Sequence, residues 1–253
     1  MKTIRVMAAV LALTGFCFAS AALAAAPAKP GKTVSVATDA TWPPMEMVDA
    51  SKQIVGFDID FMKAVAKEAG FEVAFKNTAW DGIFAGVEAG QYDAIISSVT
   101  ITPERKAKYD FSQPYINIGQ ILVVPKSVSA AKIADLKGKK VGAQIGTTGA
   151  MEVKKVAGVE LKTYDEVGLA FEDMAAGRVS GVVCDEPTAI TYALQKKEYS
   201  AKFKIVGKPF TTEAYGIVVK KGNKDLLAQI DKGIAAVKKK KIDQQLKKKW
   251  QLK

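Results

Sequence analysis

One short run of the sequence combines hydroxyl side chains with an arginine. Residues 97–105 read Ser-Ser-Val-Thr-Ile-Thr-Pro-Glu-Arg. The guanidinium of Arg105 is planar and permanently charged, so it can hold a carboxylate through two parallel hydrogen bonds. The hydroxyls of Ser97, Ser98 and Thr100, together with backbone N–H groups, can complete a cage around that carboxylate. The run therefore indicates a binding site for a small molecule that carries a carboxylate.

The same run also has a purely structural interpretation. Thr102 is a typical N-cap residue, Pro103 suits the first position of a helix, and Glu104 suits the first turn. On this interpretation Arg105 is an ordinary surface residue of a helix over residues 103–108. The two interpretations are separated only by the surrounding sequence.

The composition excludes several other kinds of site. The chain has no histidine, which removes histidine-based metal sites and the usual general base of serine and cysteine hydrolases. Its two cysteines, Cys17 and Cys184, provide no pair that could hold zinc. We therefore expect no metal and no cofactor.

The first residues predict export. Lys2 and Arg5 precede an apolar run that extends from about residue 6 to residue 18, and Ala22-Leu23-Ala24 provides a small-x-small cleavage site. This pattern is typical of a cleaved signal peptide over residues 1–24, and the apolar run is too short to span a membrane.

Cleavage of this segment affects the cysteines. Cys17 is removed with the signal peptide, which leaves Cys184 without a partner for an intramolecular disulfide. A lipid anchor at Cys17 is the alternative, although Phe16 stands where lipidation would favour a small residue. We expect the mature protein to depend on its hydrophobic core.

The mature chain is basic, with 35 basic and 26 acidic residues and a net charge of +9. Many of the lysines lie in residues 238–241 and 247–249. Apolar residues at helical spacing beside them, Leu226, Ile230, Ile234 and Val237, predict an amphipathic helix whose lysines face solvent. Together with the export signal, this favours a solvated surface over binding of nucleic acid or an anionic membrane.

From residue 33 onward, short apolar strands alternate with amphipathic helices, which predicts an α/β fold with mostly parallel, helix-covered sheets. A first unit is predicted with strands at 34–37, 72–77 and 94–97 and helices at 57–69, 80–89 and 103–108. A second unit is predicted with strands at 119–124, 140–143 and 181–184 and helices at 133–136, 169–177 and 188–195, together with one that ends near 156. A strand at 215–220 and terminal helices after residue 223 then return to the first unit.

This return predicts two lobes. The first lobe comprises residues 33–114 and 212–253, and the second comprises residues 115–211. Two connecting segments are expected, near residues 114–119 and 208–214. Ligands of such sheets bind at the carboxyl ends of the strands, which is where Asp39, Ser97–Thr100, Gln144–Thr148 and Asp185 fall.

Five ordered motifs resemble the family-3 solute-binding proteins, which are periplasmic polar-amino-acid receptors of ABC importers. The motifs are Thr38-Asp39-Ala40-Thr41-Trp42-Pro43-Pro44, Gly56-Phe57-Asp58-Ile59-Asp60-Phe61, Trp80-Asp81-Gly82-Ile83, the run 97–105, and Gly146-Thr147-Thr148 with Asp185-Glu186-Pro187. The resemblance covers essentially the whole mature chain. It implies two α/β lobes, joined by two hinge strands, that close on one amino acid.

The resemblance also implies which residues hold the amino acid. Arg105 would bind the α-carboxylate, helped by Thr100 and by the backbone around Ser98. Thr148, with Thr147 and N–H groups at a helix start, would complete this cage from the other lobe. Asp185 would bind the α-ammonium, with a helix N-cap before Pro187 as its alternative role.

The two tryptophans in the motifs occupy positions where the family places aromatic walls around the ligand side chain. Trp42 departs from the usual Tyr or Phe, and its larger face suits a guanidinium or an alkyl chain. For Trp42 and Trp80, packing in the hydrophobic core is the alternative.

Acidic residues near the expected pocket bear on ligand choice. Asp39, Glu46 and Asp58 would suit the cationic side chain of Arg or Lys. Gln144 and Ser97 offer neutral polar contacts that serve either a basic ligand or glutamine. The alternative is that Asp58 caps a helix and Asp39 organises a turn, which would favour glutamine.

These observations predict an exported, non-enzymatic, monomeric receptor for a free polar L-amino acid, Arg or Lys before glutamine. Its second partner would be the membrane permease of an ABC importer, and nucleic acid would not be one. A rival is a prephenate or arogenate dehydratase on the same fold, in which Asp185 or Glu186 transfers a proton. Another rival is the sensor domain of a receptor, which we disfavour because no signalling segment follows the terminal helices.

Overall fold

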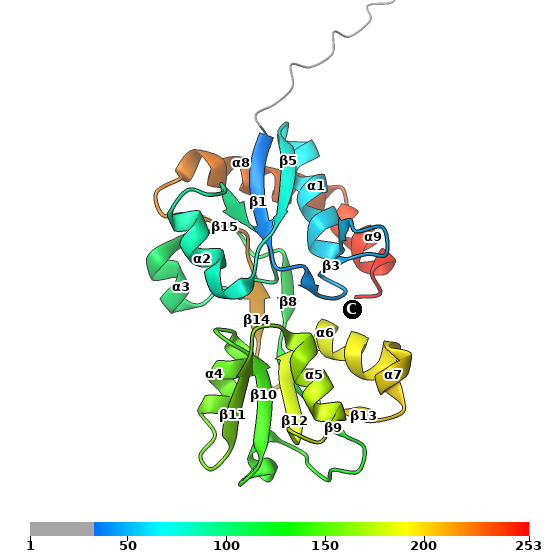
Figure 1. The fold of residues 1–253 in the computed structure, drawn as a ribbon. Helices are drawn as coiled ribbons and strands as arrows, with labels where there is room; N and C mark the ends of the chain where they lie inside the picture. The colour runs from blue at the N-terminus through cyan, green and yellow to red at the C-terminus, as the bar shows by residue number, and fades with distance from the viewer. Residues whose placement is uncertain (1–32, 253) are drawn as a thin grey trace, which may run out of the picture.

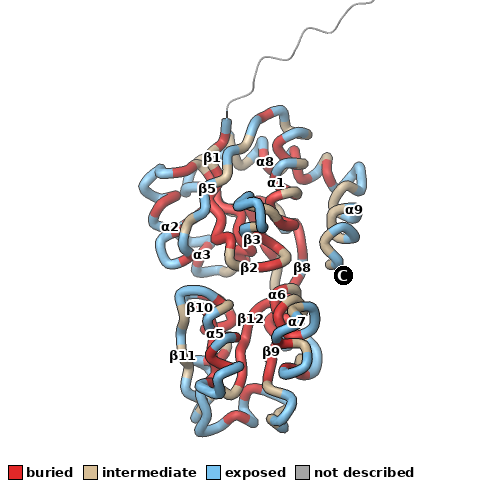
Figure 2. The backbone as a smooth tube through the Cα atoms, turned by 45° about the vertical axis from the view of Figure 1, so that its right-hand side comes forward, coloured by how far each residue is buried: buried red, intermediate tan, exposed pale blue. Residues whose placement is uncertain are grey.

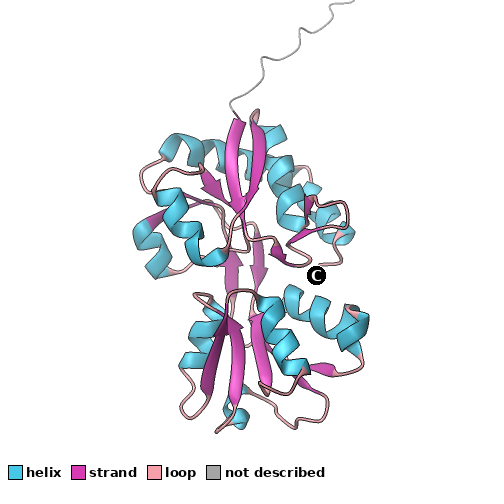
Figure 3. Cartoon of the chain, in the orientation of Figure 1, coloured by secondary structure: helices cyan, strands magenta, loops and turns pink. Residues whose placement is uncertain are grey.

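The computed structural model describes residues 33–252, so the expected signal peptide, its cleavage site and Cys17 lie outside the described residues. The described chain forms two α/β lobes, one above the other in Figure 1, with helices on both faces of each central sheet (Figure 3). Among the residues described, none of the helices has the length and apolarity that a membrane crossing requires.

The first lobe is built on a five-stranded sheet of order β5-β1-β6-β15-β7. Its strands are β1 (Thr33–Thr38), β5 (Glu72–Asn77), β6 (Ala94–Ile95), β7 (Tyr109–Phe111) and β15 (Val218–Lys220). Its helices are α1 (Phe57–Ala69), α2 (Trp80–Glu88), α3 (Pro103–Lys108), α8 (Lys224–Lys239) and α9 (Ile242–Lys249). A small sheet precedes α1, made of β2 (Thr41–Trp42), β3 (Glu46–Val48) and β4 (Ile54–Val55).

The second lobe repeats this plan with a sheet of order β11-β10-β12-β9-β13. Its strands are β9 (Gln120–Pro125), β10 (Lys140–Gln144), β11 (Glu160–Tyr164), β12 (Gly181–Asp185) and β13 (Phe203–Val206). Its helices are α4 (Thr148–Lys154), α5 (Val167–Ala175), α6 (Glu186–Ile190) and α7 (Lys197–Ser200), with a 3₁₀ turn at Ile133–Leu136 and a π-helical turn at Thr191–Gln195. The helix expected over 188–195 is therefore split between α6 and this π-helical turn.

Each sheet contains the expected parallel core but is mixed as a whole. β1 pairs in parallel with β5 and β6, and β10 pairs in parallel with β11 and β12, whereas β15 and β9 are antiparallel to their neighbours. The parallel strands β1, β10 and β12 run toward the junction between the lobes. β9 and β15 each arrive from the other lobe, so they start at the junction and run in the opposite direction.

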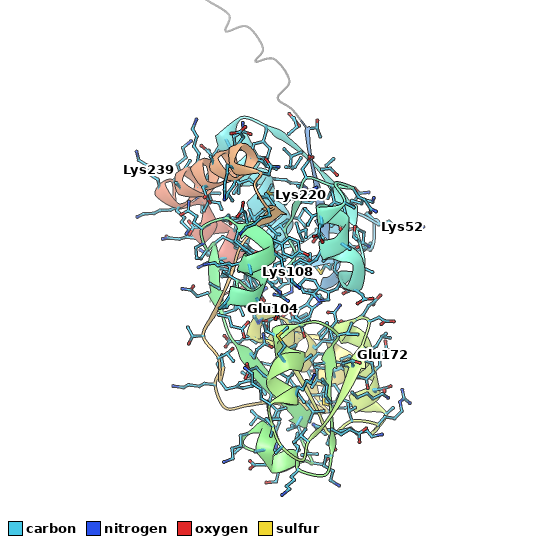
Figure 4. The ribbon with its side chains drawn as sticks, turned by 90° about the vertical axis from the view of Figure 1, so that its left-hand side faces the viewer. Lys52, Glu104, Lys108, Glu172, Lys220 and Lys239 are labelled. Carbon is cyan, nitrogen blue, oxygen red and sulfur yellow. The ribbon has the colours of Figure 1, made fainter. Side chains whose placement is uncertain are left out.

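The buried residues form a core in each lobe (Figure 2). In the first lobe, α8 packs against α1 through Ile230, Ile234 and Val237, which are all fully buried. The neighbouring lysines are exposed, and Lys239 points away from the body of the lobe (Figure 4). The predicted amphipathic helix is thus confirmed.

The lobes are connected by two segments that lie side by side. β8 (Ile116–Ile118) pairs with β14 (Glu213–Tyr215) in antiparallel register, with Ile118 opposite Glu213. Gly119 follows β8, and a Cβ built at this position would lie only 2.2 Å from the carbonyl oxygen of Thr211. The two chain segments approach this closely because Gly119 has no side chain.

We expect Gly119→Ala to lower the free energy of unfolding by about 1–3 kcal/mol, since the added methyl group overpacks two backbone segments that have no room to separate. Urea denaturation measures this change. Gly82→Ala in α2 is the matched control, because a Cβ there meets no atom within 4 Å and alanine is favoured over glycine in a helix. Equal stabilities for the two variants would show that the connection is not tightly packed.

Candidate functional site

A cavity lies between the two lobes. It is lined by Trp42, Trp80, Ser97, Ser98, Thr100, Arg105, Thr147, Thr148 and Asp185, which were all singled out from the sequence. The remaining predicted residues, Asp39, Asp58 and Gln144, are buried behind this lining. The cavity sits at the carboxyl ends of the parallel strands, as expected for sheets of this kind.

Arg105 is held in place from both lobes. Its Nη1 donates to the carbonyl of Thr100 at 2.9 Å, and its Nη2 donates to the carbonyl of Gly146, in the second lobe, at 3.1 Å. Its guanidinium carbon lies 5.3 Å from the ring centroid of Trp80 and 5.3 Å from that of Phe84. These contacts fix the plane of the guanidinium and use two of its five N–H donors, which leaves donors for a ligand carboxylate.

The local helix orients Arg105. Thr102 is the N-cap of α3, and its hydroxyl accepts a hydrogen bond from the backbone N–H of Arg105 at 3.1 Å. The structure therefore contains both predicted features: Thr102 begins the helix, and Arg105 lines the cavity. Burial lowers the pKa of the guanidinium, and the carboxylates of Asp185 and Glu213 oppose that shift.

Asp185 brings a buried carboxylate to the cavity from the second lobe. It ends β12 and stands at the N-cap position of α6, but its side chain makes no capping hydrogen bond. Instead, Oδ1 accepts a hydrogen bond from Nε2 of Gln120. Burial, and then the charge of Glu213, raise the pKa of Asp185 to about 7. The carboxyl group is thus poised to gain a cationic partner.

Trp42 extends from the first lobe into the second. It packs with the hydrophobic core around Phe171 and Tyr192, and its indole N–H donates to Oε1 of Gln144. Nε2 of Gln144 donates in turn to Oδ2 of Asp39 at 2.9 Å and to the carbonyl of Asp165 at 2.7 Å. Gln144 therefore links the lobes, and Trp42 is both a cavity wall and part of a core.

Asp39 also organises the turn that follows β1. Its Oδ1 accepts from the hydroxyl of Thr41 at 2.9 Å, and its backbone N–H donates to the hydroxyl of Ser97 at 2.8 Å. Burial raises the pKa of Asp39, while its hydrogen bonds with Gln144 and Thr41 lower it.

Asp58 and Glu46 form a buried carboxyl pair below Ser98. Oδ2 of Asp58 accepts from the backbone N–H of Ser98 at 2.8 Å and from the hydroxyl of Tyr115 at 2.7 Å. Burial raises the pKa of Asp58 to about 6, and burial together with the charge of Asp58 raises that of Glu46 well above its usual value. Burial and mutual repulsion therefore disfavour the state in which both carboxyl groups are ionised.

This pair supports the cavity rather than lining it. Ser98 has a φ of 50°, a left-handed conformation that is rare for residues other than glycine. The hydrogen bond from Ser98 to Asp58 holds it there and so shapes one wall of the cavity. Asp58 does not cap α1. The helix begins at Phe57, its N-cap residue is Gly56, and no side chain makes a capping hydrogen bond there.

Three threonines, Thr100, Thr147 and Thr148, also line the cavity. The hydroxyl of Thr147 donates to the carbonyl of Gln144 at 2.7 Å and accepts from the N–H of Ala150, so Thr147 caps α4. The hydroxyls of Thr100 and Thr148 both donate to Oε2 of Glu213, each at 2.8 Å. Neither threonine hydroxyl thus keeps its proton for a ligand carboxylate in this arrangement.

Four residues of this site were not recognised from the sequence: Phe84, Tyr115, Gln120 and Glu213. Phe84 lies one turn after Trp80 on α2, so helical periodicity could have placed it beside the same neighbour. Glu213 lies on the connecting strand β14 and Gln120 begins β9, and no spacing rule relates either residue to the motifs. Within the part of the chain that the structure describes, no group of His, Cys, Asp and Glu has the arrangement of a metal site.

Comparisons with known proteins agree with this geometry. The family model described as bacterial extracellular solute-binding proteins, family 3, matches residues 34–253. The L-cystine-binding protein TcyJ of Escherichia coli strain K12 is 35% identical over 221 residues, which cover 86% of this chain and 82% of that protein. The ABC transporter arginine-binding protein 1 of the same strain is 32% identical over 225 residues, which cover 88% of this chain and 92% of that protein.

Solved structures show the same fold. An ancestral arginine-binding protein has been solved bound to glutamine and bound to arginine. It is 44% identical to this chain, with a TM-score of 0.82, over 86% of this chain and 97% of that one. Like the two relatives above, it is a binding protein for an amino acid.

The raised pKa of Asp185 makes the stability of the unliganded protein depend on pH. The pKa of this carboxyl group is about 7 in the folded protein, against an ordinary value of 3.8 for aspartate. Its protonated form is favoured in the folded state, so its contribution is full below about pH 4 and is lost as the pH rises through about 7. We expect the free energy of unfolding of the wild type, relative to Asp185→Asn, to fall over this range.

Urea denaturation of both proteins without ligand, at a series of pH values, measures that difference. Asp185→Asn is a suitable reference because it keeps the shape of the side chain and cannot ionise. A difference that stays constant between pH 4 and about pH 8 would contradict the assigned titration.

Proposed function

Because the chain belongs to family 3 of the bacterial extracellular solute-binding proteins, we propose that it captures one polar L-amino acid and delivers it to the permease of an ABC importer. The observation that carries this proposal is that Arg105 and Asp185 line one cavity, from different lobes. A free amino acid is a zwitterion and needs one fixed cation and one fixed anion. A site with both, enclosed between two lobes, fits that requirement.

The two charges take separate roles. The unused N–H donors of Arg105 bind the α-carboxylate, and Asp185 binds the α-ammonium. Because the lobes contribute opposite halves of the site, a ligand can touch both only when they are closed. Ligand binding therefore shifts the population toward the closed state, which is the form that the permease recognises.

The charge around the cavity supports Arg or Lys as the ligand. Asp39, Asp185 and Glu213 lie in or near the cavity, whereas Arg105 is the only buried basic side chain among the described residues. A neutral zwitterion leaves this excess of negative charge uncompensated. A ligand with a cationic side chain reduces it, and the faces of Trp42 and Trp80 suit a guanidinium or an alkyl ammonium.

Glutamine is the second candidate. The amide of Gln144 already donates a hydrogen bond to the carboxylate of Asp39. Glu46 and Asp58 likewise accept hydrogen bonds from Ser98, and Asp58 accepts one from Tyr115. On this alternative, Asp39, Glu46 and Asp58 stabilise the structure and do not contact the ligand side chain. The ancestral arginine-binding protein, which was solved with either amino acid, supports keeping both ligands in view.

The dehydratase alternative is favoured by one observation. A carboxyl group with a pKa of about 7, such as that of Asp185, suits proton transfer at neutral pH. The paired cation and anion of the cavity fit a zwitterion better than they fit prephenate, which has two carboxylates and no ammonium. We therefore retain a binding function, and prephenate is included in the test below.

The remaining expectations complete the proposal. The mature protein is exported to the periplasm after loss of residues 1–24 and acts as a monomer without nucleic acid. Its lobes comprise residues 33–114 with 212–253, and 115–211. The ligand contacts come from the residues that line the cavity, and Asp39, Asp58 and Gln144 support them.

A thermal-shift screen against the twenty amino acids and prephenate tests the function. We expect Arg or Lys to give the largest shift, since a ligand that binds only the folded state adds about 2.7 kcal/mol at a hundredfold excess over Kd. Calorimetric titration then compares arginine with citrulline and lysine with norleucine, which lose the charge. No shift with any amino acid at millimolar concentration would refute the receptor proposal, and tightest binding of glutamine would establish the second candidate.

Arg105 provides a second test. We expect Arg105→Ala to weaken binding of the amino acid by about 3 kcal/mol or more, roughly a hundredfold in Kd, because the ligand carboxylate becomes buried and unpaired. Arg105→Lys should also bind weakly, since an ammonium cannot reproduce the planar fork. Arg178→Ala is the control, because Arg178 pairs with Asp173 on the outer surface of the second lobe. Wild-type affinity in either Arg105 variant is incompatible with the assigned role.

A further inference from the structure

Glu213 is positioned to control the cavity without lining it. It lies on the connecting strand β14, half-buried, on the far side of Thr100 and Thr148 from the cavity. Its Oε2 accepts from the hydroxyl of Thr100, in the first lobe, and from that of Thr148, in the second. Its Oε1 accepts from the hydroxyl of Thr211 at 2.8 Å.

These contacts decide what the two threonines can offer a ligand. A hydroxyl carries one proton and two lone pairs. Both protons are committed to Glu213 at 2.8 Å, whereas the two hydroxyl oxygens are 3.5 Å from each other. Thr100 lines the cavity, and with its proton on Glu213 its hydroxyl can offer a ligand only lone pairs. The oxygen of Thr148 already accepts from Nε2 of Gln120 at 3.0 Å.

We infer that Glu213 is a positioning residue that makes the site select for an amino group, because it withdraws the Thr100 proton and leaves an acceptor beside Asp185. Nε2 of Gln120 supports the arrangement, since it donates to Asp185, to Thr148 and, at 3.4 Å, to Glu213. Asp185 and Thr100 then provide two acceptors from opposite lobes. A ligand ammonium can donate to both, and a ligand without it donates to neither.

This inference rests on the proposed function and extends it to the choice between amino acids and their deamino analogues. Without Glu213, the Thr100 hydroxyl can turn its proton toward the cavity. It would then no longer favour an ammonium and could donate to a carboxylate. The expected change is therefore in the preference for the amino group, not only in overall affinity.

The test measures Kd by calorimetry for L-arginine and for δ-guanidinovalerate, which differs from arginine only by loss of the amino group. If the screen finds lysine or glutamine instead, the pair is lysine with ε-aminocaproate, or glutamine with glutaramate. The variant is Glu213→Met, which keeps the length of the side chain and removes both acceptor oxygens. We expect the preference for the amino acid over its deamino analogue to fall by about tenfold or more, which corresponds to about 1.4 kcal/mol.

Glu104→Met is the matched control. Glu104 is an exposed acid on α3, near the junction of the lobes (Figure 4), and like Glu213 it acts on Arg105 through its charge. No hydrogen bond connects it to either threonine, so we expect the wild-type preference to persist in this variant. A loss in both variants would show that charge near Arg105, and not the hydroxyl network, sets the preference, and would overturn the inference.

The outcomes separate the two proposals. If the wild type binds none of the amino acids, the proposed function fails and this inference fails with it. If the wild type binds but Glu213→Met keeps its preference within tenfold, only the inference fails. If Glu213→Met does not fold, Thr100→Val serves instead, because it removes the acceptor itself and must lower the same preference; an unchanged preference there also overturns the inference.

Discussion

The burial of two opposite charges in one cavity is the constraint on which this site depends. An isolated guanidinium or carboxylate is costly to remove from water, and the cost is offset only when each finds polar partners. Arg105 has two carbonyls and the faces of Trp80 and Phe84, and Asp185 has the amide of Gln120. The partners of Arg105 come from both lobes. The arrangement of the lobes and the state of these charges are consequently linked.

The protein supplies several contacts between the lobes by itself. Arg105 donates to the carbonyl of Gly146, Trp42 packs into the core of the second lobe, and Gln144 joins Trp42 to Asp39. These contacts between the lobes form without a ligand. On the proposed mechanism, a ligand that adds contacts to both lobes shifts the population toward the closed state. Its affinity includes the free energy of whatever internal contacts it must replace.

The sequence predicted several residues of the cavity and its surroundings from their positions at the ends of strands. Asp39, Ser97, Gln144 and Asp185 each follow or end a strand of a central sheet, so alternating strands and helices place them at the carboxyl ends of the strands. The mixed direction of the sheets could not be predicted in the same way, because it depends on how the chain crosses between lobes. Glu213 was missed because it lies on a connecting strand next to threonines, and its partners are distant in the sequence.

The acidic residues show why ligand choice is harder to predict than ligand class. Composition alone counted Asp39, Glu46 and Asp58 as equal candidates for a cationic side chain. The structure separates them, because Glu46 and Asp58 are buried together beneath Ser98, which raises the pKa of both and disfavours two charges there. Asp39 remains as the candidate partner for a cationic side chain, and its carboxylate already accepts a hydrogen bond from the amide of Gln144. On the proposed function, a cationic side chain that reached Asp39 would have to replace the amide of Gln144. A hydrogen bond to an ionised carboxylate is charge-assisted whether its donor is an amide or a cation, so the advantage of Arg or Lys over glutamine is the Coulomb attraction of a second charge.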